Sequence, residues 1–144
     1  MRCNKKPPFS RLHRSIPPNS QSECQRTAED PAAHARTVAF WNDAFRTALG
    51  RHPTALGRVV ATRGVAARGR AFIDAALAAV AAFDAFTPGD DPYGEHDFGV
   101  VAIHGVAVWF KIDVYDPDYA FGSQNPADPG CTRRVLTLLL PEEY

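Results

Sequence analysis

The sequence has no apolar run near the roughly 20 residues that a transmembrane helix needs, and its N-terminus lacks the apolar centre of a secretory signal. Cysteine is scarce: Cys3, Cys24 and Cys131 are widely spaced, with no CxxC pair or Cys/His cluster of the kind that binds zinc. A disulfide framework is therefore not expected. We expect a cytoplasmic protein that has no membrane partner.

The sequence also lacks the motifs of several enzyme classes. There is no His-Glu-x-x-His, phosphate-binding loop, Gly-x-Ser-x-Gly or dinucleotide fingerprint. The formal net charge is zero, yet residues 1–26 carry six basic and one acidic side chain, whereas residues 71–144 carry three and twelve. A basic half can attract nucleic acid by neutralising phosphates. Thirteen of the sixteen basic residues are Arg, however, which a GC-rich genome produces without selection for binding. A protein partner is therefore favoured over nucleic acid.

What is present divides the chain into two parts. Residues 1–26 contain two Pro-Pro pairs and almost no apolar periodicity, so burial of apolar surface cannot offset the entropy of ordering them. We predict a disordered basic arm there. Alternatively, the natural start codon lies downstream and the arm does not belong to the native protein. Residues 27–144 fit one domain, because 144 residues with 45% apolar content provide enough material for a single core.

Two helices are predicted. Asp30 followed by Pro31 is typical of an N-cap with proline at the first helical position, and apolar residues then recur at steps of three and four until Gly50. An Ala-rich second helix covers residues 67–84, where the large apolar side chains share one face. Short strands are predicted at two further places: within residues 57–65, where Gly64 favours a turn or bulge, and over residues 135–140.

The segment FGVVAIHGVAVWFKIDVYD predicts a β-hairpin that turns at His104 and Gly105, because glycine adopts positive φ freely and histidine does so better than most residues. A two-residue turn fixes a register that places His96 opposite Asp113, close enough to interact. Together the elements predict an α+β fold in which two helices pack on one face of a mainly antiparallel sheet of about four strands.

Side chains alternate between two faces along the second strand of this hairpin. Val108, Phe110 and Ile112 share one face, which the helices must cover. The opposite face is amphipathic and includes Asp113. We expect this uncovered face to bind a partner through three residues: Trp109, Lys111 and Tyr115.

Acidic residues and a histidine gather where this face meets the segment DDPYGEHDFG. A divalent metal ion is one candidate cofactor, because carboxylates and imidazole are ligands for Zn²⁺, Mn²⁺ and Fe²⁺. The residues that would bind it are Asp91, Glu95, His96, Asp97 and Asp113. Acid–base catalysis is a second interpretation, in which Asp113 orients His96 and Glu95 assists.

A third interpretation is structural, with Asp91 capping a turn, Gly94 supplying positive φ, and Arg133 or Arg134 balancing the carboxylates. This is the commonest fate of such a cluster. The favoured function is therefore a non-catalytic interaction or accessory module that uses the uncovered sheet face. The alternative is a metal-dependent or acid–base enzyme, with hydrolysis as the favoured reaction, centred on His96, Asp113, Glu95 and Asp97.

The segments WNDAFR, DDPYGEHDFG, KIDVYD and TRRVLTLLLPEEY, in that order, resemble an uncharacterised bacterial family, domain of unknown function 3768, over about residues 38–144. The resemblance implies a small bacterial protein and no established activity. The residues that match the two central motifs are Asp91, Pro92, Gly94, Glu95, His96, Asp97, Phe98 and Gly99, then Lys111, Ile112, Asp113, Tyr115 and Asp116.

Two positions depart from that pattern. Asp90 stands where the family has Asn, which adds a carboxylate to the cluster, and Val114 stands where the family has Tyr. Neither change removes His96 or Asp113, but both argue against transferring residue roles in detail.

Overall fold

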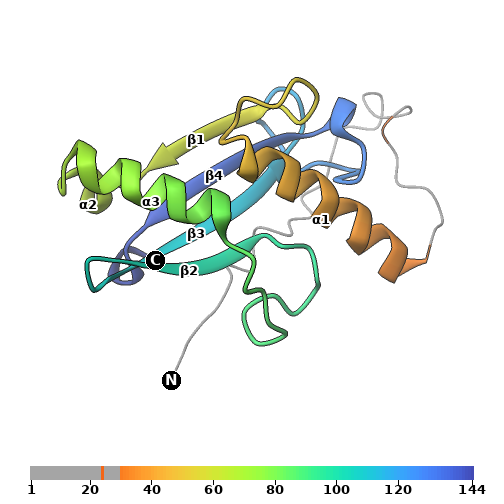
Figure 1. Cartoon of the computed structure of the whole chain (residues 1–144). Helices are drawn as coiled ribbons and strands as arrows, with labels where there is room; N and C mark the ends of the chain where they lie inside the picture. The colour runs from red at the N-terminus through yellow and green to blue at the C-terminus, as the bar shows by residue number, and fades with distance from the viewer. Residues whose placement is uncertain (1–23, 25–29) are drawn as a thin grey trace.

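The structure is a computed structural model that describes residue 24 and residues 30–144. Three α-helices and a four-stranded sheet form an α+β fold (Figure 1). The helices are α1 (Pro31–Thr47), α2 (Arg63–Ala66) and α3 (Arg70–Ala82), and the strands are β1 (Gly57–Ala61), β2 (Phe98–Ile103), β3 (Val106–Tyr115) and β4 (Arg133–Leu139). Two 3-10 turns follow late in the chain, η3 (Pro129–Cys131) and η4 (Pro141–Glu143). The predicted arm, residues 1–26, lies outside the described residues apart from Cys24.

The sheet has the strand order β1-β4-β3-β2. Strand β4 pairs parallel with β1 and antiparallel with β3, and β3 pairs antiparallel with β2, so the predicted mainly antiparallel sheet is confirmed. Strand β4 lies between two strands, so both of its edges are paired, and residues 133–138 alternate between half-buried and buried positions. Pro141, which cannot continue the ladder, follows directly after Leu140.

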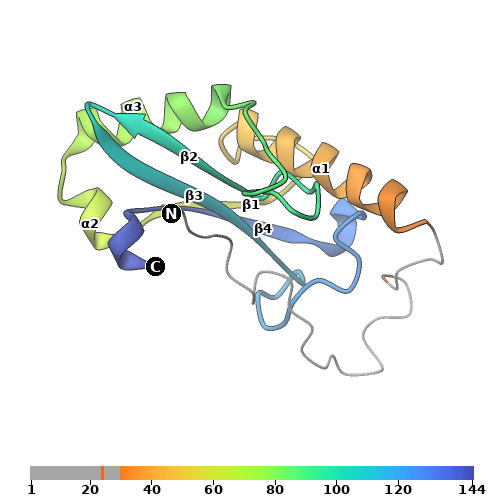
Figure 2. The same cartoon turned by 90° about the horizontal axis from the view of Figure 1, so that it is seen from below.

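Helices α1 and α3 lie on the same side of the sheet, as predicted (Figure 2). Helix α1 begins where the sequence indicates: the Asp30 carboxylate accepts a hydrogen bond from the N–H of Ala33 (3.1 Å), and proline follows it. The core between helices and sheet includes Phe45 of α1, Val80 of α3 and Phe110 of β3. No helix of the described residues is long and apolar enough to cross a membrane.

The predicted hairpin forms in the predicted register. Phe98 pairs with Lys111, and Ile103 pairs with Val106 across a turn whose two residues both have positive φ, 51° at His104 and 80° at Gly105. The turn length and the alternation of apolar residues therefore suffice to determine how β2 and β3 pair.

The segment after β1 differs from the prediction. The sequence predicts a short strand within residues 57–65 and a turn or bulge at Gly64. The strand forms as β1, which ends at Ala61, but residues 63–66 form α2. The carboxylate of Glu143 stabilises the start of this helix by accepting hydrogen bonds from Thr62 Oγ1 (2.5 Å) and the N–H of Gly64 (2.7 Å). It also accepts the N–H of Leu140 (2.9 Å). The carboxylate that stabilises the start of α2 thus comes from the other end of the sequence.

Candidate functional site

His96 lies in the loop between α3 and β2, where its backbone has the left-handed conformation (φ 57°). Residues with a side chain adopt this conformation infrequently. The buried carboxylate of Asp91 supports it by accepting hydrogen bonds from the backbone N–H groups of Glu95 (3.1 Å) and His96 (3.1 Å). Asp91, predicted as a metal ligand, thus has a structural role in the loop.

The imidazole of His96 is directed toward α1. Its Nδ1 lies 2.9 Å from Oδ2 and 3.1 Å from Oδ1 of Asp43. Its ring stacks on Phe86, with 4.1 Å between the ring centres and an angle of 1° between the planes. The His96 side chain nevertheless stays 32% exposed. A carboxylate at Nδ1 leaves Nε2 as the ring nitrogen available for proton exchange with another molecule.

Asp43 is itself held by Arg46, whose Nη2 donates a hydrogen bond to Asp43 Oδ1 at 2.7 Å. Arg46 is buried, and its Nη1 donates to the carbonyl oxygens of Val80 (2.7 Å) and Phe83 (2.9 Å) near the end of α3, where helix carbonyls need partners. The guanidinium also lies over Phe86, 5.3 Å from the ring centre. Arg46 therefore fixes the position of Asp43 relative to α3.

The predicted pair of His96 and Asp113 is wrong. The ladder does extend as far as Asp97, whose carbonyl accepts the N–H of Ile112 (2.9 Å). At His96, however, the positive φ turns the chain toward the helices, whereas Asp113 lies on the opposite face of β3, buried and paired with Lys111. The alternation of side chains along a strand predicts on which face of the sheet each side chain lies only where the backbone is extended, and at His96 the backbone is not extended.

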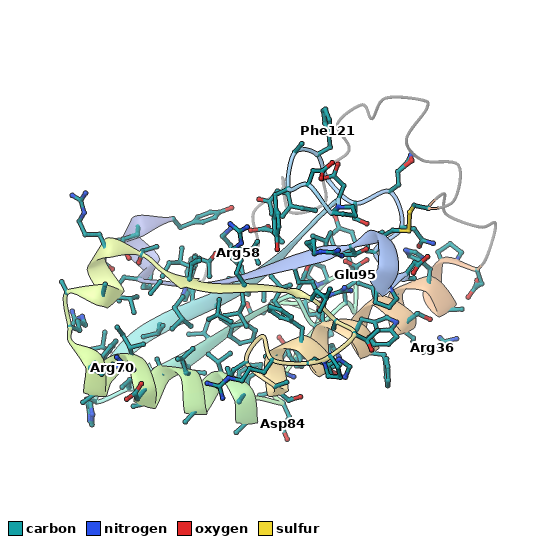
Figure 3. The ribbon with its side chains drawn as sticks, turned by 90° about the horizontal axis from the view of Figure 1, so that it is seen from above. Arg36, Arg58, Arg70, Asp84, Glu95 and Phe121 are labelled. Carbon is teal, nitrogen blue, oxygen red and sulfur yellow. A yellow bond between two sulfur atoms is a disulfide. The ribbon has the colours of Figure 1, made fainter. Side chains whose placement is uncertain are left out.

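Glu95, next to His96, faces a buried arginine. Arg134 is fully buried at the start of β4, where its Nε donates to Asn42 Oδ1 (2.6 Å) and its Nη2 donates to the carbonyl of Pro126 (2.9 Å). Burial lowers the pKa of Arg134 to about 10, and the charge of Glu95 offsets part of this effect. The Asn42 amide also donates to the carbonyl of Glu95 (2.8 Å), and Figure 3 shows Glu95 between α1 and β4. Glu95 thus helps to balance a buried charge.

The five predicted metal ligands do not come together. Asp91 bonds to the backbone, His96 faces Asp43, and Asp113 lies on the other face of the sheet. Asp97 is buried just before β2. In the part of the chain that the structure describes, no group of three or more His, Cys, Asp and Glu side chains is arranged to hold a metal ion.

The predicted interaction face is partly buried. Trp109 is half-buried, with its ring centre 5.3 Å from Phe98 and 5.7 Å from Tyr144. Lys111 is 15% exposed in its ion pair with Asp113. The third predicted residue, Tyr115, is also half-buried, beside Tyr119. Two large apolar side chains beside Trp109 are exposed, Val100 (39%) and Tyr144 (51%), and these three residues form an apolar patch.

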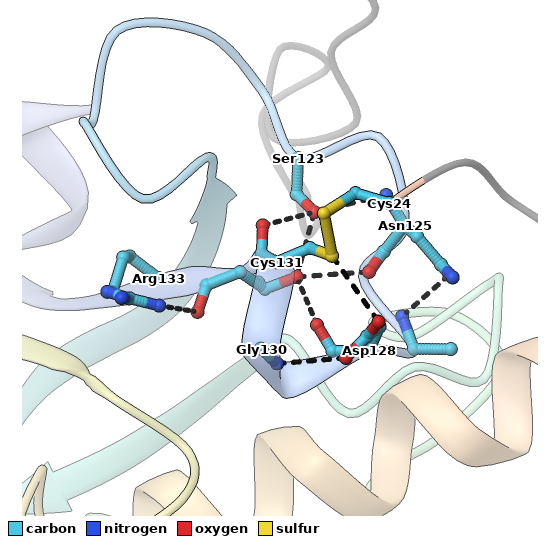
Figure 4. Close-up of a disulfide and its surroundings, with 9 residues drawn as sticks. Cys24, Ser123, Asn125, Asp128, Gly130, Cys131 and Arg133 are labelled. Carbon is cyan, nitrogen blue, oxygen red and sulfur yellow. Dashed lines mark hydrogen bonds between the residues drawn. A yellow bond between two sulfur atoms is a disulfide. The ribbon is translucent and has the colours of Figure 1, made fainter. Parts of the chain in front are cut away.

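Cys24 and Cys131 form a disulfide, contrary to the expectation from the sequence (Figure 4). The two residues are 107 apart in the sequence, and their Cα atoms lie 5.6 Å apart. Cys131 is buried in η3, next to Thr132, whose hydroxyl donates to the carbonyls of Asn125 (3.0 Å) and Asp128 (2.9 Å). Three scattered cysteines without a motif gave no signal of the pairing, because only the fold brings these two together.

Three residues around His96 were not predicted from the sequence: Asp43, Arg46 and Phe86. A signal for them does exist in α1. The buried stripe of this helix, which includes Val38 and Phe45, is interrupted by the polar residues Asn42 and Arg46, both of them buried. Buried polar side chains require partners, so they indicate that the inward face of α1 meets other polar groups.

A family model described as "Protein of unknown function (DUF3768)" matches residues 61–143, more than half of the chain. The matched segment includes His96 and begins after α1, so Asp43 precedes it, whereas the resemblance from sequence extended to about residue 38. No curated protein matches the chain. No solved structure matches it either.

Proposed function

Because the chain belongs to the DUF3768 family, whose description names no activity, we propose from the geometry of the site that Asp43 and His96 form a general acid–base centre. The observation that carries the proposal is the 2.9 Å contact between Asp43 Oδ2 and His96 Nδ1 on a side chain that stays 32% exposed. The carboxylate selects the tautomer with the proton on Nδ1, so Nε2 presents a lone pair.

The support around the imidazole favours this role over that of a solvated surface histidine. Asp43 is oriented by buried Arg46, and the ring is restrained by stacking on Phe86. The backbone of His96 is held in the left-handed region, a conformation that is common where a structure positions a functional group. Several contacts thus fix a single imidazole, which is what proton transfer in a defined direction requires.

The reaction class that fits is hydrolysis. Nε2 would take a proton from a water molecule as that oxygen attacks the substrate, and the imidazolium would return the proton to the leaving group. Asp43 would stabilise the imidazolium between the two steps without becoming protonated itself.

Matched variants test this proposal. Asparagine tolerates positive φ, so His96→Asn and His104→Asn remove two histidines that both have positive φ, of which His104 lies in the hairpin turn. We expect His96→Asn to lower the rate on a panel of chromogenic carboxyl and phosphate esters by about 100-fold or more. Asp43→Asn should lower it as well, while His104→Asn leaves it unchanged. Equal rates for His96→Asn and wild type, or no rate above buffer for wild type, would argue against the acid–base centre.

A second candidate function is a non-catalytic interaction module, and the apolar patch of exposed Val100 and Tyr144 with half-buried Trp109 favours it. Such a module would bind a protein partner through the sheet face away from the helices. The test compares pull-downs with Trp109→Ala and with Phe40→Ala, since Phe40 is an aromatic residue on α1 that is 62% exposed. The module is supported if a protein that the wild type captures is lost with Trp109→Ala and kept with Phe40→Ala. It is contradicted if both variants capture the same proteins as the wild type.

The disulfide supports a proposal about the compartment. Structural disulfides persist in oxidising compartments and are rare in the cytosol. We therefore infer that the chain functions in an oxidising compartment, in place of the cytoplasm expected from the sequence, because Cys24 and Cys131 are joined. Alkylation of the protein from its native source, followed by mass spectrometry without reductant, should find these two cysteines protected. If both are alkylated, the cytoplasmic assignment stands.

A further inference from the structure

The sheet ends in two edge strands, β1 and β2, which differ in how well they are protected. An edge strand exposes unpaired backbone groups, and natural proteins guard such edges with charged residues, proline or short strands. Strand β1 has five residues and includes exposed Arg58, which is labelled in Figure 3. The guanidinium of Arg58 lies 4.0 Å from the ring centre of Tyr119. Strand β2, FGVVAI, contains neither a charged residue nor a proline.

The backbone groups that β2 presents outward follow from its register. The N–H of Ile112 donates to the carbonyl of Asp97, so Asp97 and every second residue after it direct their hydrogen-bonding groups toward β3. The residues that direct theirs outward are Phe98, Val100 and Ala102. Within residues 30–144, these six N–H and C=O groups have no hydrogen-bond partner. The side chain of Val100 at the centre of this edge is 39% exposed.

We propose that β2 pairs antiparallel with β2 of a second copy of this chain, which extends the sheet across both subunits. The edge is its own complement: rotation by 180° about Val100 sets Val100 against Val100 of the partner subunit and Phe98 against Ala102 of the partner subunit. In this register all three outward residues of each copy form hydrogen-bonded pairs, which gives each of the six outward N–H and C=O groups a partner in the other subunit. A shift of this register by two residues in either direction would leave one of the three outward residues of each copy without a partner.

We choose a second copy of this chain as the partner of the β2 edge, because β2 contains no charged residue that would select a charged partner. Its three outward residues are apolar and evenly spaced, and Val100 lies opposite Trp109 on the same hairpin face, so pairing also buries apolar surface. In this register the hairpin turn at His104 of one subunit lies beside the start of β2 in the other subunit, and His96 is located just before that start. The inference is independent of the acid–base proposal, because it concerns backbone groups at the sheet edge.

Sedimentation equilibrium with matched lysine variants tests the pairing. Val100 and Val60 are exposed to the same extent (39% and 40%) on the two opposite edges, so Val100→Lys and Val60→Lys add the same charge at either edge. All proteins carry Cys3→Ser, which removes the third cysteine as a source of crosslinks. We expect twice the monomer mass for the reference protein and for Val60→Lys, and the monomer mass for Val100→Lys. A monomeric reference protein at about millimolar concentration, or a Val100→Lys dimer, overturns the proposal.

The register has its own test in the same background. Residues in an antiparallel hydrogen-bonded pair have Cα atoms about 5.5 Å apart, within the range that a disulfide spans. Val100→Cys should therefore form an intermolecular disulfide under mild oxidation, whereas Val60→Cys should not. Equal crosslinking of the two variants would contradict the proposed register. Both tests report mass, so their outcome is separate from that of the ester hydrolysis test.

Discussion

Nδ1 of His96 lies 2.9 Å from Oδ2 of Asp43, although 53 residues separate them in the sequence. The same carboxylate binds Arg46, so one acidic side chain joins α1, the end of α3 and the loop before β2. This contact determines where the imidazole points. Removal of the Asp43 side chain should therefore lower the stability of the fold, whether or not Asp43 takes part in catalysis.

We expect Asp43→Ala to lower the free energy of unfolding by about 1–2 kcal/mol, because it leaves the buried Arg46 guanidinium without its anionic partner. This loss in free energy of unfolding is smaller than for a fully buried ion pair, because the Asp43 side chain is 38% exposed. Asp74→Ala is the control: Asp74 pairs with Arg70 on an exposed face of α3, so its loss should change stability by less than about 0.5 kcal/mol. Urea denaturation measures both, and equal effects would contradict the role assigned to Asp43.

We expect removal of the disulfide to lower the free energy of unfolding by about 2–4 kcal/mol, because a crosslink between residues far apart restricts the unfolded chain. Cys24→Ala measures this without reductant. Cys3→Ser is its control and should match the wild type. A Cys24→Ala protein with the urea midpoint of the wild type would show that the bond between Cys24 and Cys131 adds no stability.

We expect Arg134→Lys to lower the free energy of unfolding by about 2–4 kcal/mol, although it keeps the charge. Lysine cannot reproduce the planar guanidinium that reaches Asn42 and the Pro126 carbonyl from a fully buried position. The neighbouring substitution Arg133→Lys should cost less than about 0.5 kcal/mol, because Arg133 is half-buried and, among the described residues, its hydrogen bond is to the carbonyl of Thr132 next to it. Thermal or urea unfolding of the two variants distinguishes these outcomes.

We expect stability to fall in acid through Glu143. The hydrogen bond from the Thr62 hydroxyl, with those from the N–H groups of Leu140 and Gly64, holds the pKa of Glu143 below its usual value. The folded state thus favours the carboxylate. Its contribution is complete above the ordinary glutamate pKa of about 4.3 and is lost as the pH falls through the lower pKa of the folded protein.

Two neighbouring variants isolate this effect. Glu143→Gln should lose part of the difference in urea midpoint between neutral and acidic pH, because its amide cannot be protonated. Glu142→Gln changes an exposed neighbour and should keep the wild-type pH dependence. The same pH profile in both variants would contradict the assignment to Glu143.

The hairpin could be predicted from the sequence because its determinants are local. A two-residue turn at His104 and Gly105 sets the register, and the alternation of apolar residues sets the faces, as the pairing of Phe98 with Lys111 confirms. The same rule gave the wrong partner for His96, two residues before β2. The rule assumes an extended backbone, and the hydrogen bonds from backbone N–H groups to Asp91 support a left-handed one instead.

The elements with local signals could be predicted from the amino-acid sequence: the N-cap at Asp30, the two amphipathic helices and the hairpin with its register. The parallel pairing of β1 with β4, the disulfide between Cys24 and Cys131, and the contact of Asp43 with His96 became apparent only in the folded chain. One cause accounts for all three. Periodicity and turn geometry act over a few residues, whereas these contacts join segments between 53 and 107 residues apart, and they exist only after the helices have packed on the sheet.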